Sequence, residues 1–209
     1  MKSRTRKLAL TFAASAALVA TLVAAAPAPA APANPATPAA SKVASVHGGG
    51  TIFFPYSPKD DIRFTVDAES TPWTKPLPVP GLENGLPTDA RGRVTIYHQY
   101  KETGFTAVAE AEIDCLVTGG KTATLTAIVK TANVDGWEGK RIGISVQDGE
   151  RGGPDRLGFS WGVANVDVKP DGTADQGAVG TCMAPAPFTE VTKGGFKVTP
   201  APLAPIPKP

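Results

Sequence analysis

Alternation of apolar and polar residues is the feature that most constrains what this chain can fold into. From Phe105 to Val117 every second residue is apolar, whereas Glu110, Glu112 and Asp114 occupy the other side. Because successive side chains of a strand point to opposite faces, this period predicts a half-buried β-strand. Similar runs occur at residues 62–68, 94–100, 121–131, 142–146, 157–161 and 195–198.

Glycine, Asp or Asn separates nearly all of these runs, as in antiparallel sheets. The sequence therefore predicts an all-β chain, with a single antiparallel β-barrel or β-sandwich domain. Several residues expected to point inward are small, and they leave room either for bulky neighbours or for a ligand: Ala107, Ala109, Ala111, Ala123 and Ala127. The density of protein interiors favours close packing.

The hairpin around Gly119 and Gly120 can be given a register. A two-residue Gly119-Gly120 turn would place apolar residues opposite polar ones. A three-residue loop that ends at Gly120 instead pairs Val117 with Lys121 and sets Cys115 opposite Ala123. We predict the second register, because glycine suits the left-handed position at the end of such a loop.

The two ends of the chain differ from the part between them. Residues 1–30 combine a basic start, an uncharged apolar stretch and the sequence Ala28-Pro29-Ala30, which is the pattern of a cleaved secretory signal peptide; the alternative is a membrane anchor. Residues 31–42 form a Pro/Ala-rich linker and residues 199–209 a Pro-rich tail. Residues 43–198 remain for one β domain of ordinary size.

Charge and cysteine content limit the partners and the compartment. Removal of residues 1–30 takes away four positive charges and changes the formal net charge from +2 to −2. Nucleic acid and membrane insertion are therefore not expected of the mature chain, and its partners and oligomeric state stay unknown. We predict a secreted or cell-envelope-associated protein with a Cys115–Cys182 disulfide, the alternative being a buried free Cys115.

Few residues offer catalysis or metal binding. Ser160 lies in a G-x-S-x-G sequence, but no strand-turn-helix context surrounds it and no histidine follows it. His47 and His98 have no zinc-type spacing, so no metal and no cofactor are predicted, although a site built from both histidines and a carboxylate stays open.

Two residues are the candidates for ligand contact. Trp73 lies in a Pro-rich segment expected to be a long surface loop, where binding residues often occur. His98 shares a strand face with Val94, Ile96 and Tyr100. Trp137 and Trp161 are weaker candidates, because tryptophans usually pack a core or a loop.

The segment from Gln147 to Arg156 contains Asp148, Glu150 and Asp155 among glycines, which raises the alternatives of a turn or a calcium site. Alternating runs precede and follow it, and its Gly and Pro residues are typical of turns. We predict a hairpin connection, because calcium needs six to eight oxygens and two arginines lie nearby.

Four stretches in this order resemble a group of small secreted actinobacterial β proteins for which no activity is established: residues 48–52, 115–125, 146–157 and 194–198. The resemblance implies a secreted β domain and transfers no catalytic residue. The insertion at residues 70–87 departs from the pattern.

Two functions follow as hypotheses. The first is a secreted or envelope-associated non-enzymatic β module that binds a ligand or partner through its loops. The second is a secreted enzyme that uses a barrel cavity, with His98 or a carboxylate as general base. A large internal cavity that His98 faces beside a carboxylate would favour the enzyme, whereas a filled interior would favour the binding or structural module.

Overall fold

A computed structural model describes residues 43–149, 152–162 and 165–207. The predicted signal peptide and the Pro/Ala-rich linker lie outside these residues. Within them, no helix is both long and apolar enough to cross a membrane.

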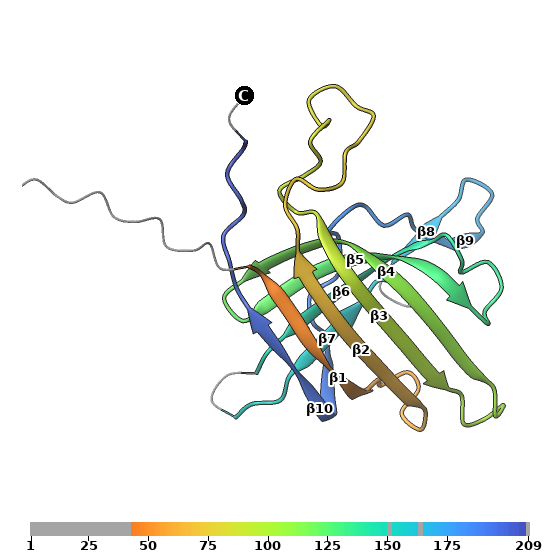
Figure 1. The fold of residues 1–209 in the computed structure, drawn as a ribbon. Helices are drawn as coiled ribbons and strands as arrows, with labels where there is room; N and C mark the ends of the chain where they lie inside the picture. Colours follow the sequence, from red (N-terminus) through yellow and green to blue (C-terminus); the bar gives the residue numbers. More distant parts are fainter. Residues whose placement is uncertain (1–42, 150–151, 163–164, 208–209) are drawn as a thin grey trace, which may run out of the picture. The chain divides into compact units, whose positions relative to one another are not determined.

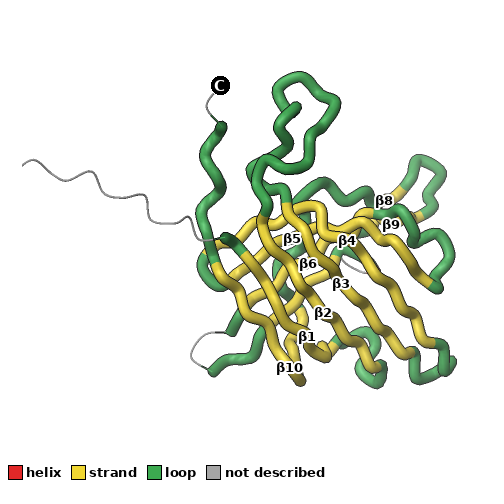
Figure 2. Tube along the Cα trace, viewed as in Figure 1, coloured by secondary structure: helices red, strands yellow, loops and turns green. Residues whose placement is uncertain are grey.

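Eight strands form one closed antiparallel barrel (Figures 1 and 2). Around the barrel they are β1 (Ser45–Phe53), β10 (Thr189–Thr199), β7 (Arg156–Phe159), β6 (Arg141–Gln147), β5 (Thr122–Ala132), β4 (Thr106–Gly119), β3 (Ala90–Gln99) and β2 (Asp61–Ser70). The short strands β8 (Val166–Val168) and β9 (Ala174–Gln176) pair only with each other. The all-β prediction is confirmed, and the architecture is the barrel rather than the sandwich.

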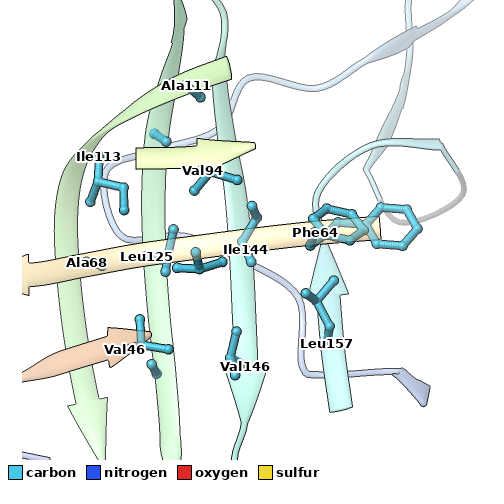
Figure 3. Packing of buried hydrophobic residues seen from close by; sticks show 14 of the residues in the cluster. Val46, Phe64, Ala68, Val94, Ala111, Ile113, Leu125, Ile144, Val146 and Leu157 are labelled. Carbon is cyan, nitrogen blue, oxygen red and sulfur yellow. The ribbon is translucent and has the colours of Figure 1, made fainter. Parts of the chain in front are cut away.

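The barrel interior is filled by side chains (Figure 3). Aliphatic residues from almost every strand are fully buried, among them Val46, Val66, Val94, Ile113, Leu125, Ile144, Val146, Leu157 and Val198. Small residues lie between them, including Ala68, Ala90, Ala111, Ala123 and Ala127. Alternation of large and small side chains lets facing strands interdigitate, so the expected close packing holds for the body of the barrel.

Glycines close the barrel where its first and last strands meet. Gly48, Gly49 and Gly50 of β1 pair with Phe196, Gly195 and Gly194 of β10. Gly48 and Gly194 have φ values of +139° and +80°. A Cβ at either position would collide with a carbonyl oxygen of the opposite strand, so only glycine allows this approach.

The predicted register of the β4–β5 hairpin is wrong. Gly119 pairs with Thr122, and Cys115 pairs with Thr126 rather than with Ala123. The register shifts between Ile113 and Cys115, which is a β-bulge at Asp114. Since one extra residue reverses the alternation, Ile113 lies inside the barrel while Cys115 moves to the outer face.

The bulge brings Cys115 to its disulfide partner. Cys115 and Cys182 form a disulfide with a Cα–Cα distance of 5.4 Å, as predicted. Thr126 stabilises the same place, because its hydroxyl donates to Asp114 at 2.6 Å and accepts the Cys182 N–H at 3.1 Å. The disulfide therefore fastens the segment between β9 and β10 to the outer wall.

The segment that joins β2 and β3 is ordered by one carboxylate. Asp89 is buried, and its Oδ2 atom accepts the backbone N–H groups of Thr74, Lys75 and Leu86 at 3.0, 2.8 and 3.1 Å. This connection and the C-terminal tail extend from the same end of the barrel (Figure 1). The expected long loop is thus present, with a fixed base.

The Pro-rich tail is attached to the domain. β10 continues to Thr199, and Ala201 exchanges hydrogen bonds with the Thr118 hydroxyl through its N–H at 3.1 Å and its carbonyl at 3.3 Å. The strand also begins at Thr189, six residues before the predicted run at 195–198. The start of the strand was missed because Val191 is the only apolar residue from Thr189 to Lys193, which is too few to define an alternating run.

Loss of the disulfide should destabilise the domain without changing its fold. For a loop closed across 67 residues, chain entropy predicts a loss of about 4 kcal/mol when both cysteines are replaced by serine. Urea unfolding of the C115S/C182S variant measures this. Reducing agent should lower the unfolding midpoint of the wild type and leave the variant unchanged. Equal midpoints for the two proteins would contradict the assignment.

Candidate functional site

A cavity of about 280 Å³ lies at the end of the barrel opposite the tail. The connections β1–β2, β3–β4 and β5–β6 and the residues after β7 all contribute to its wall. Six aromatic side chains line it: Phe54, Phe64, Tyr100, Trp137, Phe159 and Trp161. The volume is close to the lower limit of small-molecule sites, which suits a ligand of one or two rings.

The aromatic rings support one another. Phe159 is the centre of the group, with ring centroids 4.8 Å from Trp161, 5.4 Å from Phe54 and 5.9 Å from Phe64. Trp137 meets Trp161 edge to face at 5.4 Å. Rings held in such contacts lose little freedom when a ligand binds, so the cavity wall is preformed.

His98 supplies a polar group to this apolar wall. Alternation along β3 places it on the inner face after Val94 and Ile96, at the level where the packed core ends. Its ring stacks on Tyr100 at 3.8 Å between centroids. Its Nε2 atom lies 2.8 Å from Oδ2 of Asp60, and the two side chains are 18% and 9% exposed.

Asp60 is held in its charged form. The Lys101 backbone N–H, which donates to Oδ1 at 2.9 Å, is the largest cause that lowers the pKa of Asp60, followed by the hydrogen bond to His98. The Ser57 hydroxyl adds a smaller contribution, and burial acts in the opposite direction. Asp60 therefore orients His98 as an ionised acceptor.

The sequence candidates separate in space. His98 lines the cavity, whereas Trp73 lies at the other end of the barrel, where its indole N–H donates to the Pro205 carbonyl at 3.0 Å. Trp137 and Trp161, the weaker candidates, are the tryptophans that meet in the cavity. Asp60 was not among the candidates, and its position just before β2 carries no distinctive pattern.

The two histidines do not form a joint site. His47 lies on the outer wall, where its Nδ1 is 2.6 Å from Asp67, while His98 faces inward and bonds to Asp60. Among the described residues, no group of three or more His, Cys, Asp or Glu side chains is arranged to hold a metal ion.

Ser160 is buried directly after β7 rather than within a strand, and its Oγ accepts the Gly143 N–H at 2.8 Å. This is a structural role, and the position does not resemble an exposed nucleophile elbow.

The segment from Gln147 to Arg156 joins two neighbouring antiparallel strands, as predicted, with Gln147 opposite Arg156. Asp155 accepts the N–H groups of Gly149 and Phe196 at 2.6 and 2.5 Å. These bonds direct its carboxylate to the barrel backbone. Glu150 lies outside the described residues.

Asp148 likewise points to protein donors. Its Oδ2 lies 3.2 Å from the Lys121 ammonium, 3.3 Å from that of Lys197 and 3.3 Å from the Val198 N–H. Burial alone would raise the pKa of Asp148, but the Val198 N–H and the two lysines together hold that pKa below its usual range. The Asp148 carboxylate, which follows β6, therefore connects the start of β5 to strand β10.

Comparisons with protein-family models, with curated proteins and with solved structures found no match. The resemblance to secreted actinobacterial β proteins therefore stays a prediction.

Substitution of Asp148 by Asn should make stability less dependent on pH. A carboxyl whose folded pKa is lowered stabilises above its unfolded pKa of about 3.9 and loses this contribution as pH falls through the folded pKa. We expect D148N to lower the free energy of unfolding by about 1 to 2 kcal/mol at pH 7. The difference should shrink between pH 4 and pH 2.

Urea unfolding at several pH values measures this, with D135N at an exposed carboxylate as the matched control. A deficit in D148N that persists unchanged at pH 2 would show that the charge is not the cause.

Proposed function

We propose that this chain is an exported, non-enzymatic β-barrel module that binds a small, mainly apolar ring compound in the mouth of its barrel. The observation that carries the proposal is the cavity of about 280 Å³, which is walled by six aromatic side chains and reached by the polar side chains of His98 and Ser57. Apolar walls with few polar groups are typical of small-molecule sites, where the polar groups fix the ligand's orientation.

The arrangement of the chain ends agrees with a displayed binding module. β1 starts, and β10 ends, at the end of the barrel that carries the β2–β3 connection (Figure 1). The cavity lies at the opposite end. Both described chain ends therefore lie away from the cavity.

The compartment rests on two observations of different kinds. The Cys115–Cys182 disulfide is consistent with an oxidising environment. The sequence pattern of residues 1–30 adds the expectation of export through a signal peptide. Together they support secretion or association with the cell envelope.

The enzyme is the second candidate, because His98 faces a cavity and has a carboxylate partner in Asp60. Such a pair is able to take up a proton. Ser57 also lines the cavity, but its hydroxyl bonds to Asp60 and not to His98. In nucleophilic catalysis by serine, the serine hydroxyl donates its hydrogen bond to the histidine. Because the Ser57 hydroxyl contacts Asp60 instead, the arrangement favours a binding function over catalysis.

Filling the cavity should abolish binding. Ala107 lies on its wall, opposite His98 in the β3–β4 pairing, and a phenyl ring at this position would occupy ligand space. With naphthalene as probe, equilibrium dialysis should give one site in the wild type and at least tenfold weaker binding in A107F.

W73F, a substitution at the other end of the barrel, should bind naphthalene as the wild type does. Absence of naphthalene binding in the wild type, or equal binding in A107F, would refute the proposed site.

A further inference from the structure

One ring nitrogen of His98 is not used by the protein. Nε2 bonds to Asp60, whereas Nδ1 makes no hydrogen bond with any residue in the described parts of the chain. Among those residues, every fully buried side-chain nitrogen or oxygen atom has a hydrogen-bond partner. Because Nδ1 has none, it is not fully buried. It is accessible, on a side chain that lines the cavity.

The neighbours of His98 decide which nitrogen carries the hydrogen. Asp60 accepts the Lys101 N–H at Oδ1 and faces His98 with Oδ2. An ionised carboxylate only accepts, so Nε2 must be the donor. In the neutral ring the hydrogen is therefore on Nε2, and the accessible Nδ1 carries a lone pair.

The ligand must match this lone pair and an apolar, aromatic wall. A donor hydroxyl on a planar ring satisfies both, because the ring stacks on aromatic side chains while its O–H donates to Nδ1. An ionised acid fits poorly, since it would bring a second negative charge near Asp60 into a site with few donors.

We propose that the cavity selects neutral aromatic compounds that carry a hydroxyl group of the phenol class, and that His98 Nδ1 accepts the hydroxyl hydrogen. This inference rests on the proposed binding function and names the ligand class for the same site.

Three probes of related shape separate the hydrogen bond from apolar binding: naphthalene, 2-methoxynaphthalene, which only accepts, and 2-naphthol, which also donates. Equilibrium dialysis at pH 8 should show 2-naphthol binding about fivefold more tightly than 2-methoxynaphthalene. One net hydrogen bond gives a ratio of this size.

In H98F this ratio should fall to about one, and in W73F it should stay at its wild-type value. A ratio near one in the wild type, with all three probes bound, would overturn the inference but not the binding function. No binding by any probe would overturn the binding function itself. A ratio retained in H98F would also overturn the inference.

D60N provides a second test if H98F does not fold. The Asn oxygen keeps the Lys101 N–H, and its amide then donates to Nε2, which moves the ring hydrogen to Nδ1. Nδ1 would then donate equally well to either probe, so the ratio should again fall to about one. A merely structural role for Asp60 predicts equal weakening of all three probes and an unchanged ratio, which would contradict the assignment.

Discussion

Closure of the barrel between β1 and β10 is the constraint on which the rest of the structure depends. An open sheet would leave two unpaired edges and a core exposed between them. Here the edges meet because Gly48 and Gly194 let the two backbones approach more closely than any side chain permits. Closure fixes the diameter of the barrel, and the diameter fixes which side chains fill it. Aliphatic residues fill most of its length, and the aromatic residues at one end leave the cavity.

Local pattern was sufficient for the fold class and for most strands. The alternation in β2 and β3 appears in the structure as a buried face and a more exposed face, whereas β6 is buried on both faces. The sequence pattern gave a wrong prediction where a strand departs from strict alternation of its two faces. The bulge at Asp114 cannot be recognised from the sequence, because Cys115 continues the alternating apolar series of Ala111 and Ile113. The disulfide was nevertheless predicted, because cysteine number and compartment do not depend on the face that a strand presents.

Only some residues of the candidate site could be predicted from the sequence. His98 was identified by its strand face, and the structure places it on the cavity wall. Trp73 was preferred for its long loop, but that loop is ordered by Asp89 at the other end of the barrel. Asp60, Trp137 and Trp161 come from three different connections, and barrel closure alone brings these to one end. No signal within a single segment could have grouped them.

We expect a ring compound to bind among Trp137, Trp161 and His98 and not at Trp73. The chain has three tryptophans, and each gives its own indole N–H signal in a ¹⁵N–¹H correlation spectrum. During titration with 2-naphthol, the signals of Trp137 and Trp161 should shift together and saturate, while that of Trp73 should stay in place. A shift of the Trp73 signal alone, or no shift of any indole signal at saturating 2-naphthol, would contradict the account.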